Sequence, residues 1–245
     1  KLGMPHWCGA DVAGEIAAVG SDVSGWAVGQ RVVVDPGINR FDDEYTRRGA
    51  ASVSPGYCIL GEHLRGGAAE YVAVPAANLA EMPAGLDFVA AAAPLLVSLT
   101  AWRMLIHRAD LHPAETVLVV GAGGGVNSMA IQVAKLAGAT VWVVADGAEK
   151  SAKAARLGAD RAIDRSQTDW VREVLKATGR RGVDVVVDNV GRATLAGSMQ
   201  AVARGGRIVI VGNTSGPKAE IDIRFIFGKQ ISLIGSTMGS HQDFL

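Results

Sequence analysis

The stretch Thr116-Val-Leu-Val-Val-Gly-Ala-Gly-Gly-Gly-Val-Asn-Ser-Met-Ala-Ile-Gln-Val-Ala-Lys135 decides the fold, because a β-branched apolar run passes through a glycine-rich turn directly into an amphipathic helix. Gly121 allows the chain to leave the strand tightly, and Gly123 to Gly125 carry no Cβ atoms that would block a pyrophosphate. The helix that follows directs its free N–H groups and the positive end of its dipole at that charge. This pattern is typical of a phosphate-binding βα unit.

A second apolar strand supports this interpretation. Gly138 to Ala145 begins at the distance from the first strand that a βαβ unit requires, whereas a flexible glycine linker would not lie between apolar strands. From about Ala93 onward, strands and helical segments alternate, which predicts a doubly wound parallel sheet of the α/β class with helices on both faces. We expect helices at 95–108, 126–137, 148–157, 168–178 and 192–203, and strands at 116–120, 140–145, 162–163, 183–188, 206–211 and 231–235.

The first part of the chain differs in composition and in hydrophobic pattern. Residues 10 to about 92 are rich in Gly, Pro and short Val runs, which predicts short strands joined by turns. The runs are Glu15–Val19, Arg31–Val34 and Ala69–Val74. This part of the chain is therefore expected to form a small β domain.

Composition limits the possible partners. With 245 residues, 49% hydrophobic and 20% charged, the chain is expected to bury one or two cores. Lys plus Arg equals Asp plus Glu at 24 each, so nothing points to nucleic acid, and we expect a small-molecule partner. The apolar stretch Phe88–Val97 contains Pro94 and is too short to span a bilayer, so no membrane association is expected. We expect no signal peptide, and Cys8 and Cys58 suit two reduced thiols in a cytoplasmic protein better than one bridge.

A series of short motifs covers nearly the whole chain in a specific order: Gly9–Gly14, Val28–Val32, Gly66–Tyr71, Leu99–Trp102, the glycine turn, Leu157–Asp160, Gly182–Asp188 and Gly205–Val209. This order resembles the medium-chain dehydrogenase/reductase superfamily. The resemblance implies a GroES-like β domain at 1–92, a Rossmann dinucleotide-binding domain at 93–239 and the start of a return to the first domain at 240–245. It also implies a nicotinamide cofactor between the two domains, and a longer protein, since family members extend further at both ends.

The chain departs from the zinc-containing members of that superfamily. They read Gly-His-Glu where this chain reads Gly9-Ala10-Asp11, and they place a further zinc ligand at the position that resembles Leu96. Neither Ala10 nor Leu96 offers an imidazole, thiolate or carboxylate to zinc. The four cysteine positions of the family's structural zinc resemble Arg40, Asp43, Thr46 and Ser54, and the five histidines are scattered without ligand spacing. We therefore expect neither zinc ion.

Without a Lewis acid, the interconversion of alcohol and aldehyde loses its usual electrophile. The zinc-free quinone oxidoreductase branch, which the longer turn Gly121–Asn127 also resembles, passes hydride to a quinone or to the β-carbon of an α,β-unsaturated carbonyl. Two alternatives remain: a zinc-independent alcohol or aldehyde reductase, and a protein that binds the cofactor without catalysis. Asp11 matches an acidic residue beneath the family's site, but a packing role is equally expected, and no catalytic residue is assigned.

The end of the second strand bears on the choice of cofactor. Ala145 occupies the position where NAD enzymes carry an acid for the ribose hydroxyls, although Asp146, one residue later, can still take that role. Lys150 and Arg165 match positions that face the 2′-phosphate in quinone oxidoreductases, and their alternative is solvated surface. We expect NADP(H) in preference to NAD(H).

The remaining predicted contacts lie around the nicotinamide half of the cofactor. Thr100 resembles a threonine that approaches the nicotinamide, or else its hydroxyl bonds back to its own helix. Asn127 replaces the third glycine of the family turn, where its side chain would crowd the helix–strand contact or the pyrophosphate, or donate a hydrogen bond to the phosphate. The resemblance also implies a homodimer or homotetramer, because in this family the apolar segment at 221–227 often leads to pairing of two subunits along the sheet edge. The full predicted cofactor-binding set is Thr100, Gly121, Gly123, Gly124, Gly125, Val126, Asn127, Ala145, Asp146, Lys150, Arg165, Asn189, Val190, Val211 and Gly212.

Overall fold

The computed structural model describes residues 3–245, which form two compact units. Unit 1 contains the chain up to Leu99 together with Met238–Leu245, and unit 2 contains Thr100–Thr237. The boundary between the units falls inside helix α3 (Leu95–Trp102), seven residues beyond the expected end of the first domain at residue 92.

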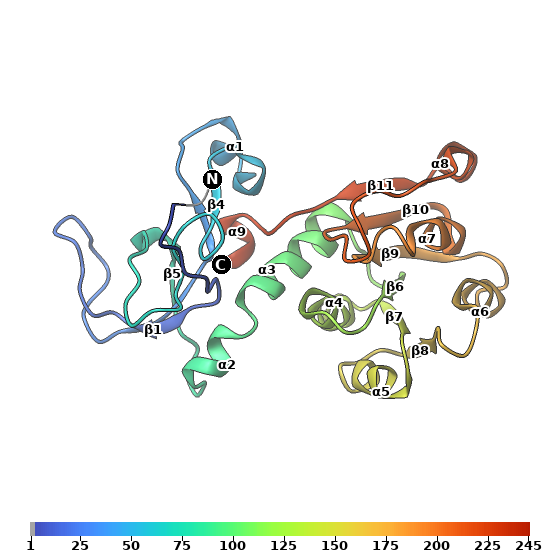
Figure 1. Ribbon diagram of the computed structural model, residues 1–245, viewed down its shortest axis with the longest axis horizontal. Helices are drawn as coiled ribbons and strands as arrows, with labels where there is room; N and C mark the ends of the chain where they lie inside the picture. Colours follow the sequence, from blue (N-terminus) through green and yellow to red (C-terminus); the bar gives the residue numbers. More distant parts are fainter. Residues whose placement is uncertain (1–2) are drawn as a thin grey trace. The chain divides into compact units, whose positions relative to one another are not determined.

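Unit 2 is built on a six-stranded sheet in which every neighbouring pair is parallel (Figure 1). The strand order is β11-β10-β9-β6-β7-β8, so the first strand of the unit, β6, lies between β9 and β7. This order confirms the predicted doubly wound α/β fold, and it places a topological switch point at the carboxyl ends of β6 and β9. The strands are β6 (Thr116–Val120), β7 (Thr140–Ala145), β8 (Arg161–Asp164), β9 (Val183–Asp188), β10 (Val202–Ile210) and β11 (Ser232–Gly235).

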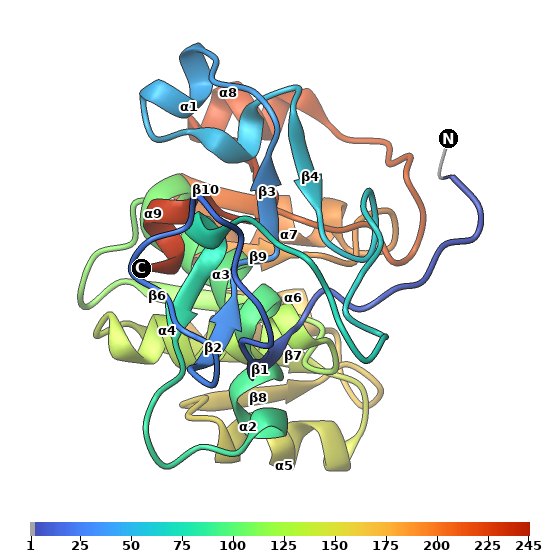
Figure 2. The ribbon, with the colours of Figure 1, turned by 90° about the vertical axis from the view of Figure 1, so that its left-hand side faces the viewer.

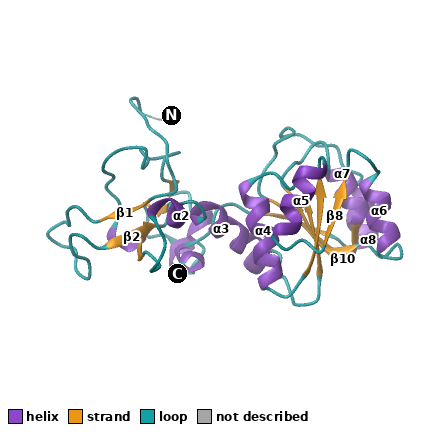
Figure 3. Cartoon of the chain, turned by 90° about the horizontal axis from the view of Figure 1, so that it is seen from below, coloured by secondary structure: helices purple, strands orange, loops and turns teal. Residues whose placement is uncertain are grey.

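Side chains alternate across this sheet and make two cores. Val117 and Val119 pack on the face covered by α4, whereas Leu118 and Val120 pack on the face covered by α7, and all four are at most 1% exposed. Figure 3 shows α4 and α5 on one side of the strands and α6, α7 and α8 on the other. The helices of this unit are α4 (Gly125–Leu136), α5 (Ala148–Arg156), α6 (Trp170–Ala177), α7 (Leu195–Ala201), α8 (Ile223–Lys229) and the π-helical turn η3 (Arg103–Arg108).

Unit 1 contains a three-stranded antiparallel sheet and a separate hairpin (Figure 2). Val33 and Val34 of the central strand contribute to two small cores, one on each face of the sheet. Cys8 is exposed, Cys58 is buried, and both thiols are free, as predicted. The strands are β1 (Ala13–Glu15), β2 (Arg31–Val34), β5 (Leu79–Glu81) and the hairpin β3 (Gly37–Asn39) and β4 (Tyr57–Ile59); the helical segments are α1 (Glu44–Arg47), η1 (Ala51–Val53), η2 (Ala76–Asn78), α2 (Phe88–Ala92), most of α3, and α9 (His241–Phe244).

Several sequence predictions of secondary structure are wrong in detail, among them the strand expected at 206–211, which spans Val202–Ile210. Ala69–Val74 is not a strand, because its backbone forms no ladder hydrogen bonds with a strand of the described chain. The strand expected at Glu15–Val19 is Ala13–Glu15, since only these residues pair with β2. The helix expected to reach 203 ends at Ala201, because Val202 already pairs with Val183 of β9.

The helical run Phe88–Arg108 is longer than the apolar stretch seen in the sequence. It comprises 21 residues with a hydropathy of 1.7, so by length and composition alone it passes as a membrane span. One such helix is weak evidence, because the core helix of a globular protein passes the same test. Pro94 divides this run, since α2 ends at Ala92 and α3 begins at Leu95.

A largely buried ion pair joins Glu115, just before β6, to Arg207 of β10. Arg207 donates to both carboxylate oxygens of Glu115 at 2.7 Å, and the two side chains are 18% and 20% exposed. The same guanidinium donates to the carbonyl oxygens of Ala109 and Asp110. The hydrogen bonds from Arg207 hold the pKa of Glu115 below its ordinary value.

We expect Arg207→Met to lower the free energy of unfolding by about 2–3 kcal/mol, because Glu115, largely out of water, loses its ion partner and keeps only the hydrogen bond from the backbone N–H of His112. Since the pKa of Glu115 is lowered in the folded state, the stabilisation is complete above its ordinary pKa of about 4.3 and is lost as the pH falls through the lower folded value. Urea unfolding at pH 7 and pH 3 tests this. Arg224→Met, which breaks an exposed pair with Asp222, should change the stability far less, and equal effects would contradict the prediction.

Candidate functional site

The glycine turn lies at the switch point of the sheet, between β6 and α4. Gly121 has φ +91°, a conformation that side-chain-bearing residues rarely adopt, and a Cβ there would lie 3.1 Å from Val190 Cγ2. Gly123 to Gly125 are exposed, and Gly124 is the N-cap of the 12-residue helix α4. The turn therefore presents bare backbone and a helix N-terminus at the edge where open α/β sheets bind ligands.

Asn127 lies beneath the turn. Its side chain is 6% exposed, and its Nδ2 donates to the carbonyl oxygens of Val120, at 3.0 Å, and of Gly121. Its Oδ1 accepts from Asn189 Nδ2 at 2.7 Å, and Asn189 Oδ1 accepts from the backbone N–H of Val211 at 2.9 Å. Both N–H groups of this amide are thus engaged by backbone carbonyls, which does not favour the alternative in which Asn127 donates to a phosphate.

A buried acid that the sequence analysis did not assign shapes the loop after β9. Asp188 is fully buried, and its Oδ1 accepts from the backbone N–H groups of Val190 and Gly191 and from Thr194 Oγ1. Its Oδ2 accepts from Ser198 Oγ at 2.6 Å. A signal was present in the sequence, since an acid that ends an apolar strand and is followed by hydroxyl residues suits such a network. The Asp188 carboxylate thus holds Asn189 and Val190 in place.

The loop after β10 is joined to the loop after β9. Val190 O accepts from Ser215 N at 2.9 Å and from Ser215 Oγ at 2.7 Å, and Asn189 O accepts from Thr214 N at 3.3 Å. Val211 and Gly212, which were predicted to contact the cofactor, lie at the start of this second loop and are half-buried. Of the predicted nicotinamide-side residues, Asn189, Val190, Val211 and Gly212 are therefore brought together at one edge of the sheet.

The residues expected to select the cofactor also gather near the end of β7. Ala145 is buried, whereas Asp146, Lys150 and Arg165 are exposed. Arg165 Nη2 lies 3.4 Å from Asp146 Oδ2, and a Cβ built on Gly123 would lie 3.8 Å from Lys150 Cε. The Asp146–Arg165 pair is worth at most about 1 kcal/mol at such exposure, so a bound phosphate can compete for the guanidinium.

Thr100 and Asp11 occupy positions in or beside α3. Thr100 is 3% exposed within the helix. Asp11 Oδ1 accepts from the backbone N–H of Leu96 at 2.8 Å, so its carboxylate satisfies a free donor in the first turn of α3. This contact favours the packing role that was weighed for Asp11.

The positions that resemble zinc ligands do not fit the metal. Ala10 and Leu96 have no donor atoms, and within residues 3–245 no group of three or more His, Cys, Asp and Glu side chains could hold an ion. At the structural-zinc positions, Asp43 Oδ1 accepts from the backbone N–H and the hydroxyl of Thr46, both at 2.9 Å, and Asp43 Oδ2 accepts from Ser54 Oγ at 2.6 Å. Asn39 joins this polar cluster by donating to Thr46 Oγ1 at 2.5 Å.

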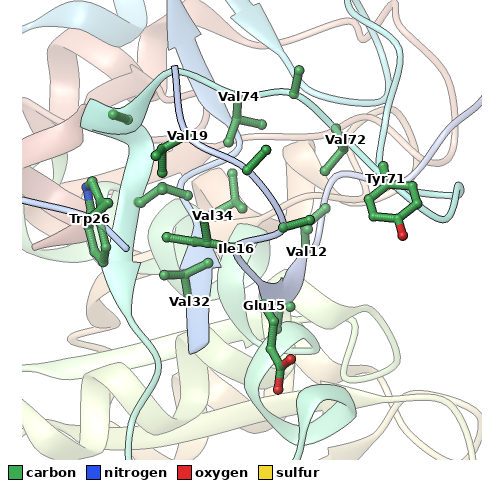
Figure 4. Close-up of a pocket in the computed structure, with 18 of the residues that line it drawn as sticks. Val12, Glu15, Ile16, Val19, Trp26, Val32, Val34, Tyr71, Val72 and Val74 are labelled. Carbon is green, nitrogen blue, oxygen red and sulfur yellow. The ribbon is translucent and has the colours of Figure 1, made fainter. Parts of the chain in front are cut away.

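An apolar groove of about 690 Å³ lies within unit 1. Figure 4 shows Ile16, Val34 and Val74 among the side chains that line it. Its rim includes the extended segment Ala69–Val74, which has no ladder partner in the described chain. None of the predicted cofactor-binding residues lines this groove, so it is not the candidate cofactor site.

Comparison with known proteins connects both units to one family. Residues 1–84 match the family model described as alcohol dehydrogenase GroES-like domain, and residues 125–245 match the one described as zinc-binding dehydrogenase. Among solved structures, a crystal structure of an NAD-dependent alcohol dehydrogenase is similar with a TM-score of 0.94 and 43% identity, and the match covers 98% of this chain and 70% of that one.

Two curated relatives carry different names. A crotonyl-CoA carboxylase/reductase of Cereibacter sphaeroides is 34% identical, with 94% of this chain and 60% of the relative covered. A quinone oxidoreductase of Pseudomonas aeruginosa is 32% identical, with 98% of this chain and 66% of the relative covered. The chain thus spans 60% to 70% of the length of these three proteins.

Proposed function

The chain belongs to the medium-chain dehydrogenase/reductase superfamily, and on this premise we propose that it transfers hydride from NADPH to a quinone or an α,β-unsaturated carbonyl without a metal ion. The relatives are named as dehydrogenases, reductases and oxidoreductases, and the protein is accordingly an NAD(P)H-dependent oxidoreductase. The proposal of metal-free transfer to a conjugated acceptor rests on one observation, which is that Ala10 and Leu96 offer no side-chain ligand to zinc.

Cofactor binding is assigned to unit 2. The exposed backbone of Gly123 to Gly125 and the N-terminus of α4 would hold the pyrophosphate, because free N–H groups and the helix dipole favour an anion there. Lys150 and Arg165 would contact the 2′-phosphate, and the loops after β9 and β10 would face the nicotinamide. When bound, the nicotinamide supplies the hydride.

The choice of acceptor follows from electrostatics. A carbonyl that receives hydride directly develops charge on its oxygen, which zinc stabilises in metal-dependent members of the family. In a quinone or enone, that charge is delocalised over the conjugated system, so hydrogen bonds and orientation carry more of the stabilisation. The relatives named quinone oxidoreductase and crotonyl-CoA carboxylase/reductase support this class of acceptor, whereas the similar alcohol dehydrogenase supports the alternative of an alcohol or aldehyde substrate.

Steady-state turnover tests the proposal. NADPH and NADH are each supplied with a panel of quinones, enones, enoyl thioesters and aldehydes, and NADP+ and NAD+ are each supplied with a panel of alcohols. We expect NADPH oxidation with the conjugated acceptors. A protein that oxidises alcohols with NAD and ignores the conjugated acceptors would contradict the proposal, and one that binds the cofactor but turns over no substrate would be a non-catalytic member of the family.

Metal independence also predicts how chelation and substitution near α1 change the thermal unfolding temperature. We expect dialysis against a chelator to leave the thermal unfolding temperature unchanged, whereas Asp43→Ala lowers it, because the cluster of Asn39, Asp43, Thr46 and Ser54 loses its acceptor. The hydrogen bonds from Ser54 and then Thr46 lower the pKa of Asp43, so its stabilisation is lost as the pH falls through that lowered value. Asp42→Ala, next in the chain but paired only with exposed Arg47, is the matched control. Stoichiometric zinc that survives dialysis would contradict metal independence.

We also propose that the protein is a homodimer or homotetramer. Strand β11 forms the outer edge of the six-stranded sheet, and Ile223 and Phe227 of the neighbouring α8 are 64% and 70% exposed. An unpaired sheet edge beside exposed apolar side chains supports association of two copies. Light scattering after size-exclusion chromatography tests this, and a monomer at micromolar concentration would contradict it.

A further inference from the structure

We infer that the Asn127–Asn189 amide pair is a positioning device that fixes the distance between the glycine turn and the two loops that follow β9 and β10. The inference rests on the proposed function, because it assigns the two ends of one cofactor to the two sides of this pair. It gives Asn127 a role other than the crowding or the phosphate contact that the sequence left open.

The pair connects three strand ends through a continuous chain of hydrogen bonds. Asn127 Nδ2 donates to the carbonyl oxygens at the end of β6 and the start of the turn, Asn127 Oδ1 accepts from Asn189 Nδ2 at 2.7 Å, and Asn189 Oδ1 accepts from Val211 N at 2.9 Å. Each amide uses its donor and its acceptor end. Rotation of either amide by half a turn would place two oxygens or two N–H groups face to face, so only one arrangement satisfies the whole chain.

This chain of hydrogen bonds lies beyond the sheet proper. The pairing of β6 with β9 ends at Val120 and Asp188, so Asn189 extends past the last ladder position. The loops after β9 and β10 are already joined to each other through Val190, Thr214 and Ser215. In the described part of the chain, no second side-chain hydrogen bond links these loops to residues 121–127. The amide pair therefore sets where the two loops lie relative to the turn, while the sheet holds its own strands.

The spacing matters for hydride transfer. A dinucleotide whose pyrophosphate is held by Gly123 to Gly125 must bring its nicotinamide to within about 3–3.5 Å of the acceptor, and small misplacements there cost rate steeply. The adenosine half, near Lys150 and Arg165, does not depend on the loops after β9 and β10. Loss of the pair should thus change turnover and the binding of the nicotinamide half, and leave the adenosine half unaffected.

The experiment compares Asn189→Ala with the wild-type protein. We expect kcat with the best acceptor from the panel to fall roughly ten- to a hundredfold. Calorimetry should show an unchanged Kd for 2′,5′-ADP, which represents the adenosine half alone, and a raised Kd for NADPH. Asn189→Asp should behave in the same way, because its carboxylate still accepts from Val211 N but turns an oxygen toward Asn127 Oδ1.

Two further variants separate positioning from general stability. Asn127→Ala and the double variant Asn127→Ala/Asn189→Ala should be no worse in kcat than Asn189→Ala, since the two amides act as a unit. Gln132→Ala removes an amide one turn further along α4 and should leave both Kd values and kcat unchanged.

The inference is overturned if Asn189→Ala keeps the wild-type kcat and NADPH affinity. It is also overturned if the variant weakens 2′,5′-ADP as much as NADPH, because the pair would then support the whole unit rather than its nicotinamide side. If the wild-type protein reduces no acceptor, the proposed function fails separately, and the ratio of the two Kd values still decides the inference; for a protein that prefers NADH, AMP and NADH replace 2′,5′-ADP and NADPH.

Discussion

Gly124→Asp is expected to weaken the binding of NADPH and NADH alike by roughly a hundredfold or more. Gly124 is the N-cap of α4, with φ −91° and ψ 154°, and a Cβ there meets no atom within 4 Å. The variant should fold normally, because this backbone conformation suits any residue and Asp is a favoured N-cap. Its carboxylate would stand beside the proposed pyrophosphate, and two like charges about 4 Å apart near a protein surface repel by about 4 kcal/mol.

Gly124→Asn is the matched control for this charge. Asn has the shape of Asp and is an equally good N-cap, but it carries no charge. Titration of each variant with both cofactors should show a large loss for Asp and a small change for Asn. If the two variants bind equally, the pyrophosphate does not lie at this turn, and the assignment of Gly123 to Gly125 is wrong.

Removal of either cation near the end of β7 is the second large expected effect. Arg165→Ala and Lys150→Ala should each weaken NADPH roughly ten- to a hundredfold, because a charge-assisted hydrogen bond to a phosphate is worth about 1.5–3 kcal/mol. NADH has no 2′-phosphate, so its dissociation constant should barely change. Isothermal titration with the two cofactors separates the outcomes.

Asp146→Ala is the reciprocal test. Asp146 Oδ2 lies 3.4 Å from Arg165 Nη2, so its removal frees the guanidinium and should leave NADPH binding equal or tighter. If this variant instead cripples NADH binding while the two cationic variants leave NADPH untouched, Asp146 binds the ribose hydroxyls. The protein would then be NAD-dependent, although the glycine turn would keep its role.

The sheet and the glycine turn could be predicted from sequence because their signals are local and strong. Val117 to Val120 form a continuous apolar run, as expected of a parallel strand that is covered by helices on both faces. The glycines that follow are typical of a phosphate-binding turn. The strand prediction at Ala69–Val74 is wrong because pairing between strands is not a local property. Its composition suits a strand, but a strand also needs a partner, and pairing is not encoded within the segment itself.

The details of the site depended on contacts between distant residues. Asn127 and Asn189 are 62 positions apart, so no local pattern could show that one amide accepts from the other. At the polar cluster around Asp43, the sequence showed only that the cysteines of the family's structural zinc are absent. The hydroxyl and carboxylate side chains at these positions are nevertheless well suited to hydrogen-bond one another. The pairing of Asp146 with Arg165 likewise appears only when β7 and β8 lie side by side.

Deuteride transfer tests the central claim most directly. The protein is first dialysed against a chelator, and its metal content is measured. It is then supplied with NADPH that carries deuterium at the transferred position, together with an enone. The account predicts a zinc-free protein, a saturated ketone product and deuterium at its β-carbon. An allylic alcohol with deuterium at the former carbonyl carbon, formed only when zinc is restored, would contradict it.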